Sequence, residues 1–196
     1  YRFNPRKGLL FELAVTAGIK RIIPNLTITS LSNADNDFVA AYDSLDLQVF
    51  QTSAESTINY FLPLGRSLTL LIGNRSGAKW SQQPIFFNEY YRIGGSGILR
   101  GFDEESIRAQ YYSVLTAEFR YLLGLNSYFS TFVDCAAAYN DFRESQKWDL
   151  PFGFGVGLSF QTSAGIFALN VALGRQLQNP LDFRTAKTHF GFVSLF

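Results

Sequence analysis

Hydrophobic and polar residues alternate along most of this chain, and the alternation is clearest in residues 150–174, which carry no charge. An uncharged run of that length is also the signature of a helical membrane span. Within it, however, large apolar side chains occupy every second position and are separated by glycine or small polar residues: Phe152, Phe154, Val156, Leu158 and Phe160. A period of two belongs to a β-strand with one apolar face. A polar turn at residues 161–163 follows, so the segment predicts a β-hairpin.

The same period predicts eight strands in the whole chain. They cover residues 9–16, 44–62, 67–74, 111–122, 128–138, two stretches within 150–174, and 189–196. A blurred pattern near residues 54–56 predicts a β-bulge there. Long loops at residues 21–42, 80–108, 140–149 and 175–187 alternate with short turns. This asymmetry is typical of outer-membrane barrels, which have short periplasmic turns and longer external loops.

The chemistry of the two strand faces decides between a membrane barrel and a soluble one. In the strand at residues 111–122, Leu115 and Phe119 share one face, whereas Glu118 and Arg120 share the other. In the first strand, Glu12 is expected to point to the interior. A soluble barrel such as a lipocalin is the alternative, and it would place the bulky residues inside. The small, polar face is better suited to a wet lumen, so we expect an all-β, antiparallel transmembrane β-barrel.

Composition narrows the class further. The chain has 196 residues, enough for one domain, and 17% of them are charged, against about 25% in typical soluble proteins. Phenylalanine and tyrosine are abundant, at 20 and 10 residues, which favours a β structure with a lipid-facing surface. The net charge of +1 gives no basic footprint for nucleic acid. Methionine is absent even from position 1, so we expect a processed product or a piece of a longer protein.

Candidate catalytic groups are few. Cys135 is the only cysteine, which excludes an internal disulfide, and His189 is the only histidine. One of each cannot form a structural zinc site, and no nucleophile motif is present. The glycines at residues 94–97 lack the lysine and helix of a phosphate-binding loop. We therefore expect no enzymatic activity, no cofactor and no metal, and we expect His189 to be a polar residue of the rim or lumen.

One loop concentrates unusual residues. Three glycines in four residues precede Arg100, and Gly101 follows it, so the arginine should stand at the tip of a tightly bent loop. If it is buried, it needs acceptors. Glu118 and Asp134 lie on adjacent predicted strands in the same interior register and could clamp it. The alternatives are a solvated loop arginine and two solvated lumen carboxylates.

This loop resembles the signature of the Omp85 superfamily of outer-membrane barrels. The resemblance rests on Pro84, Glu89, Tyr90, Gly94, Gly95, Leu99, Arg100, Gly101 and Phe102. It implies that the loop at residues 80–108 folds back into the barrel lumen. It also implies a barrel of sixteen strands, of which residues 1–196 would supply the last eight.

Two further stretches are similar to the same family. Residues 117–120 resemble its strand motif with an inward glutamate, here Glu118. Residues 132–136 resemble its aromatic-x-aspartate-x-glycine motif, in which the acid, here Asp134, meets the loop arginine. Ala136 stands where the family has glycine, which makes a close approach of the loop less favourable there. The final strand contains the aromatic residues Phe190, Phe192 and Phe196, which resemble the sorting signal of bacterial outer-membrane barrels. Ser194 departs from this signal. An edge strand ending a soluble domain is the alternative.

Size supports a partial barrel. The interior of an eight-stranded barrel is just wide enough for its own side chains, so a loop of 29 residues cannot also fit inside. We therefore expect a half-barrel, completed by the N-terminal remainder of the same protein or by a second copy. The resemblance implies insertion of barrel proteins into the outer membrane of a Gram-negative bacterium, or translocation of polypeptides across it. The partners would then be outer-membrane lipid, client polypeptides and accessory assembly proteins. A passive porin, or a barrel that anchors a passenger domain, is the alternative.

Overall fold

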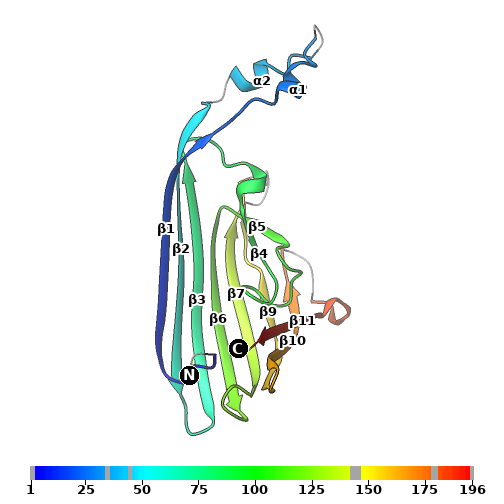
Figure 1. The fold of residues 1–196 in the computed structure, drawn as a ribbon. Coiled ribbons are helices and arrows are strands. Elements are labelled where there is room, and N and C mark those ends of the chain that lie inside the picture. Colours follow the sequence, from blue (N-terminus) through cyan, green and yellow to red (C-terminus); the bar gives the residue numbers. More distant parts are fainter. Residues whose placement is uncertain (1–2, 34–35, 44–45, 142–146, 178–180, 195–196) are drawn as a thin grey trace.

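The computed structural model describes residues 3–33, 36–43, 46–141, 147–177 and 181–194. The fold is all-β, and eight long strands form a single antiparallel sheet in the order β1-β2-β3-β6-β7-β9-β10-β11 (Figure 1). The bounds of these strands are β1 Gly8–Arg21, β2 Gln48–Pro63, β3 Leu68–Ser81, β6 Tyr111–Leu122, β7 Tyr128–Tyr139, β9 Phe152–Gln161, β10 Gly165–Arg175 and β11 Lys187–Ser194.

Shorter elements occupy the long connections at one end of the sheet, and tight turns close the other end (Figure 1). They are α1 Leu26–Thr29, α2 Ala40–Asp43, η1 Phe87–Glu89, β4 Tyr91–Ile93, β5 Ile107–Ala109, β8 Trp148–Asp149 and η2 Phe183–Thr185. No helix in the described ranges is long and apolar enough to cross a membrane.

The eight predicted strands are present, but three details of the prediction were wrong. The first strand runs to Arg21 rather than to residue 16. The bulge near residues 54–56 does not exist, because β2 pairs without a break with β1 on one side and with β3 on the other. The third strand runs to Ser81 rather than to residue 74. Its second half contains polar residues such as Arg75 and Ser76, which weaken the alternation, yet the ladders to β2 and β6 continue through them. Backbone pairing with both neighbouring strands, rather than an alternation of apolar residues, maintains the second half of this strand.

The exposure of the two faces is the reverse of that in a soluble protein. On the outer face, Leu115 is 53% exposed and Phe119 is 49% exposed, whereas the inward Glu118 and Asp134 are 4% and 1% exposed. Glu12 also lies on the inner face, since the register carries that face from β6 through β3 and β2 to β1. Soluble domains bury their large apolar side chains. Apolar residues outside and charges inside are the pattern of a barrel in lipid.

Aromatic residues form a belt across the sheet at the end with the long loops. Trp80, Tyr111, Tyr139 and Trp148 make successive ring contacts, with centroids 6.1, 5.6 and 5.1 Å apart. Tyr121 lies ten residues further along β6. At about 3.3 Å per residue and the usual strand tilt, this separation corresponds to a height of about 25 Å. That height matches the apolar band of outer-membrane barrels, and aromatic belts mark its edges.

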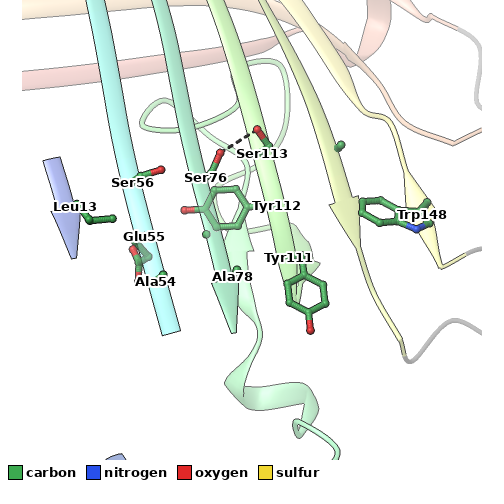
Figure 2. Close-up of a pocket in the computed structure, with 12 residues that line it drawn as sticks. Leu13, Ala54, Glu55, Ser56, Ser76, Ala78, Tyr111, Tyr112, Ser113 and Trp148 are labelled. Carbon is green, nitrogen blue, oxygen red and sulfur yellow. Dashed lines mark hydrogen bonds between the residues drawn. The ribbon is translucent and has the colours of Figure 1, made fainter. Parts of the chain in front are cut away.

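Small residues leave a hollow beside this belt. A cavity of about 380 Å³ lies over β2, β3 and β6, towards the ends that carry the long loops (Figure 2). Ser56, Ser76 and Ser113 stand opposite one another in the register and line it together with Tyr111 and Trp148.

The described part of the sheet is open. β1 and β11 are its two ends, and each pairs with a single neighbour among the described residues. Side chains on both faces of β1 are exposed, including the inward Leu10 and the outward Leu13. Completion of the barrel by a preceding segment or by a second copy therefore remains a prediction.

Candidate functional site

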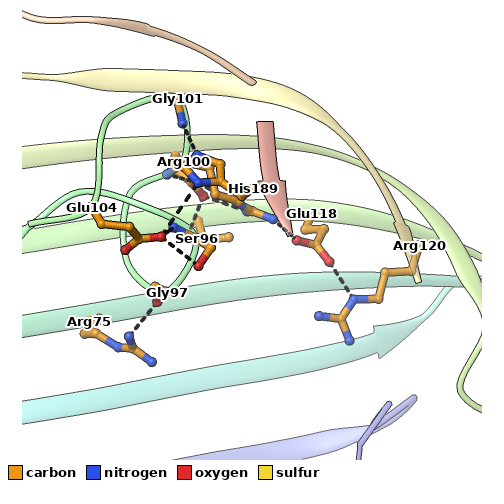
Figure 3. A network of polar contacts seen from close by, with 11 residues as sticks. Arg75, Ser96, Gly97, Arg100, Gly101, Glu104, Glu118, Arg120 and His189 are labelled. Atoms are coloured by element: carbon orange, nitrogen blue, oxygen red, sulfur yellow. Dashed lines mark hydrogen bonds and ion pairs between the residues drawn. The ribbon is translucent and has the colours of Figure 1, made fainter. Parts of the chain in front are cut away.

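Residues 82–110, which we call the inner loop, connect β3 to β6 and fold onto the face that carries Glu118 and Asp134 (Figure 3). Their bounds differ from the predicted 80–108 because β3 continues to Ser81 and β6 begins at Tyr111. The loop is not structureless, since β4 and β5 pair as a short antiparallel ladder. This ladder carries the tip of the loop along the inner face of the sheet.

The tip itself is a tight turn. The backbone N–H of Gly95 donates to the carbonyl of Leu99 at 2.9 Å. The Glu104 carboxylate accepts from the backbone N–H of Ser96 at 2.8 Å and from its hydroxyl at 3.0 Å. Positive φ angles occur at Gly94, Gly95 and Gly101. The predicted glycine-rich bend is therefore held by hydrogen bonds on both of its sides.

An apolar cluster holds the inner loop to the sheet, from the β4–β5 ladder to the tip of the loop. Buried loop residues pack with inward residues of β6 and β7 in one cluster that consists of Ile93, Leu99, Phe102, Ile107, Ala109, Tyr112, Val114, Ala136 and Ala138. Leu99 is fully buried, and burial of one such side chain is worth about 1.5–3 kcal/mol. Ala136, which replaces the glycine of the resembling motif, belongs to this cluster. Its methyl group contributes to packing at this level of the sheet.

Arg100 is clamped by both predicted acids. Its Nε and Nη2 atoms donate to the two Asp134 oxygens at 2.8 Å each, and its Nη1 donates to Glu118 Oε2 at 2.5 Å. Its backbone N–H also donates to Asp134 at 3.1 Å. The Phe132 ring lies 3.4 Å from the guanidinium carbon, and the Thr116 hydroxyl donates to Asp134 at 2.9 Å. Every carboxylate oxygen of Asp134 is thus satisfied, which makes this a fully bonded buried ion pair.

A second arginine extends the network. Arg120 Nε donates to the other oxygen of Glu118 at 2.7 Å, and Arg120 Nη1 donates to the side-chain oxygen of Asn4 at 3.3 Å. Burial opposes the charge on Arg100, but the hydrogen bond to Asp134 and the charge of Glu118 together raise the pKa of Arg100 above its ordinary value. The alternation of residues in this strand predicted that Arg120 lies on the inner face, but it indicated no role for the side chain. Its position two residues after Glu118, on the same face of the strand, was the signal that could have indicated this contact.

Glycine in the strands lets the tip approach the wall. A Cβ atom at Gly153 in β9 would lie 1.9 Å from the carbonyl oxygen of Arg100. A Cβ at Gly174 in β10 would lie 2.4 Å from the carbonyl oxygen of Gly101. Gly153 and Gly174 stand opposite each other in the register. They form a flat patch of backbone against which the tip rests, on the two strands that follow β7, the strand with the glycine position of the resembling motif.

The last strand also contacts the tip. His189 is 8% exposed, and its Nε2 accepts from the backbone N–H of Gly101 at 3.4 Å. Its Nδ1 lies 3.7 Å from Glu104 Oε1. On the same strand, Lys187 Nζ lies 2.7 Å from Asp103 Oδ1. From the sequence we expected only a rim or lumen position for His189 and no role for Lys187, since no local pattern links them to the loop.

The aromatic residues of the last strand point away from the site. Phe190 and Phe192 are exposed on the outer face, and their ring centroids lie 6.0 and 4.7 Å from that of Phe167. Phe196 lies outside the described residues. The role of these residues in sorting stays a prediction.

Space remains on both sides of the docked tip. A cavity of about 140 Å³ separates it from β2 and β3, where Arg75 Nη1 donates to the carbonyl of Gly97 at 2.6 Å. Another cavity, of about 200 Å³, is bounded by polar residues of β6, β7, β9 and β10. The described residues contain no group of three His, Cys, Asp or Glu side chains that could hold a metal ion. This arrangement holds the inner loop against the inner face of the sheet.

Comparison with known families agrees with this geometry. The sequence matches the Omp85 superfamily domain over residues 1–193. The chain belongs to the Omp85 superfamily. Membership of this superfamily indicates an outer-membrane β-barrel, which fits the apolar outer face and the aromatic belt of the sheet. No curated protein matches the chain.

Proposed function

We propose that this Omp85 domain inserts β-barrel proteins into the outer membrane of a Gram-negative bacterium, or translocates polypeptides across it, without enzymatic chemistry of its own. Its partners would be the lipid of that membrane, client polypeptides and accessory assembly proteins. Superfamily membership and the docked inner loop support the proposal. The observation that carries it is the inner loop, whose Arg100 is held against the inner face of the sheet by Glu118 and Asp134.

An unpaired edge has a direct physical use. A strand at the edge of a sheet presents free backbone N–H and C=O groups, and another chain can pair with them. In lipid such groups cannot be left unsatisfied, so the edge must be covered either by the rest of the barrel or by a client strand. β11 is the candidate strand for this exchange, since it pairs with β10 alone among the described residues. A weakly closed seam at β11 would open to admit a client strand.

The proposal is tested with the full-length protein in phospholipid vesicles. An unfolded outer-membrane barrel is added, and its folding is followed by its change in electrophoretic mobility. Vesicles with the protein should fold the client about tenfold faster than empty vesicles. A cysteine pair that links β11 across the seam should abolish the acceleration when oxidised and restore it when reduced, so each sample serves as its own control.

A barrel that only anchors a passenger domain, or a passive porin, predicts a different result. Client folding would then proceed at the rate seen in empty vesicles, and the disulfide would change nothing. Unchanged acceleration in the oxidised sample would exclude the seam as the site of insertion.

A further inference from the structure

The segment before β1, residues 3–6, reaches the inner face of the sheet at the end with the tight turns, which we call the turn end. Asn4 is 1% exposed there. Its Nδ2 donates to the carbonyl of Leu125, in the turn between β6 and β7, at 3.2 Å. Arg6 Nη2 donates to the carbonyl of Gly124 in the same turn at 3.0 Å. The segment is therefore bonded to a turn that begins at β6, the third strand from β1 in the sheet.

Asn4 also contacts the charged residues beneath the loop tip. Its Oδ1 accepts from Arg120 Nη1 at 3.3 Å. The rings of Phe61 and Tyr128 lie near the same guanidinium, with centroids 5.6 and 4.8 Å from its central carbon. Arg120 is 9% exposed, so these neighbours and Glu118, rather than water, set the position of its guanidinium.

Glu118 is shared between two arginines (Figure 3). Its Oε2 accepts from Arg100, and its Oε1 accepts from Arg120. An arginine often binds a carboxylate through two parallel hydrogen bonds, which is the strongest arrangement of the two groups. Arg120 instead donates to one oxygen of Glu118 through Nε and to Asn4 through Nη1. The second oxygen of Glu118 consequently stays with Arg100.

We propose that Asn4 is a positioning residue for the Arg100 clamp. It acts through Arg120, because the acceptor on Asn4 keeps that guanidinium turned away from the second oxygen of Glu118. Without this acceptor, Nη1 of Arg120 would be buried and unbonded, which is costly. Arg120 would then rotate to bind both oxygens of Glu118. Arg100 would lose this partner and would hold the loop tip through Asp134 alone, so a change in residues 3–6 at the turn end is transmitted to the tip.

Trypsin cleavage after Arg100 tests the proposal on the full-length protein in phospholipid vesicles, without any client. Trypsin reaches this bond only when the tip leaves the wall, so the cleavage rate reports the fraction of undocked tips. Asn4→Leu is close in size to the native residue but has no acceptor. It should speed cleavage about tenfold, the factor expected for one lost hydrogen bond to a charged group. Asn126→Leu is the matched control, since Asn126 is also buried at the turn end but donates to Gln161, and it should cleave at the wild-type rate.

Asn4→Asp separates the contact with Arg120 from the contact with Leu125. Aspartate keeps an acceptor for Arg120 but cannot donate to the Leu125 carbonyl, so it should hold the tip as firmly as the wild type. This measurement also decides the question if Asn4→Leu does not fold, as judged by its electrophoretic mobility. Faster cleavage in Asn4→Asp would overturn the proposal, and so would equal cleavage rates in Asn4→Leu and Asn126→Leu.

A double substitution tests whether Asn4 acts through Arg120. Arg120→Gln removes the guanidinium that competes for Glu118, so the addition of Asn4→Leu should then leave the cleavage rate unchanged. A further rise in the double variant would mean that Asn4 holds the tip by another route and would overturn the proposal. These measurements contain no client, so their outcome is independent of the proposed function, which client folding tests separately.

Discussion

The carbonyl oxygen of Arg100 rests on the backbone of Gly153, so closely that a Cβ atom there would lie 1.9 Å away. Gly153→Ala should therefore lift the loop tip from β9, since the Gly153 backbone is fixed in its ladders to β7 and β10 and cannot move away. Trypsin should then cleave at Arg100, which is otherwise held inside the clamp. The appearance of the two fragments on a gel measures this.

Gly97→Ala provides the matched control for this substitution. Gly97 also lies in the tip, but no atom lies within 4 Å of a Cβ built there. It should leave the protein as resistant as the wild type. Equal resistance of both variants would show that the contact at Gly153 does not hold the loop.

The clamp itself makes a prediction about stability. Asp134→Asn keeps the shape of the side chain but leaves Arg100 buried with only Glu118 as a charged partner. Breaking a buried, bonded ion pair costs about 3–5 kcal/mol, so the free energy of unfolding should fall by that amount. Denaturant unfolding in vesicles measures it. Asp141→Asn removes a carboxylate from an exposed pair with Lys147 and should have little effect. A loss below about 1 kcal/mol in Asp134→Asn would contradict the clamp.

The orientation of the sheet is tested on its outer face. Leu115 lies near the middle of the segment between Tyr111 and Tyr121, so Leu115→Arg should place a charge deep in lipid. Such a change costs about 2–4 kcal/mol at the bilayer midplane and much less near the interface. Leu123→Arg, in the turn after β6, is the control. Similar losses of unfolding free energy in the two variants would mean that Leu115 does not face hydrocarbon.

Disulfide bonds between introduced cysteines test whether a second copy or a preceding segment completes the barrel. Single cysteines at Leu9, Phe11 or Leu13 of β1 are combined with Phe190→Cys in β11, after Cys135→Ser removes the native thiol. We expect no bond within one chain, because an eight-stranded barrel is too narrow to enclose the inner loop. Bonds between two chains would identify a second copy as the missing half, and their absence would favour a preceding segment. A bond within one chain would refute the half-barrel.

The strands could be predicted from the sequence because the outer face of the sheet is apolar and the inner face is polar. Glu118 and Arg120 alternate with Phe119, and that alternation fixes both the strand and the direction of its charges. The Arg100 clamp was found for the same reason, since Glu118 and Asp134 share a register on neighbouring strands. Where the outward position is polar, as at Ser76 beside the inward Arg75, the pattern lost the strand although the backbone ladder continued.

The contacts that depend on the path of the inner loop could not be predicted from the sequence. His189 meets Gly101 across 88 positions, and Lys20 meets Glu89 across 69. Both pairings depend on where a folded loop crosses the sheet, and no local period encodes that. The close approach at Gly153 was missed because every second residue of β9 before Ser159 is glycine, so none stood out.

The four charges beneath the loop tip cancel. Arg100 and Arg120 supply two positive charges, and Glu118 and Asp134 supply two negative ones. Three ion pairs, Arg100–Asp134, Arg100–Glu118 and Arg120–Glu118, connect them. This part of the wall consequently creates almost no electrostatic potential in the space beside it. If the proposed translocation passes through this space, acidic and basic client segments would meet the same surface, and any selection by charge would occur at another part of the protein.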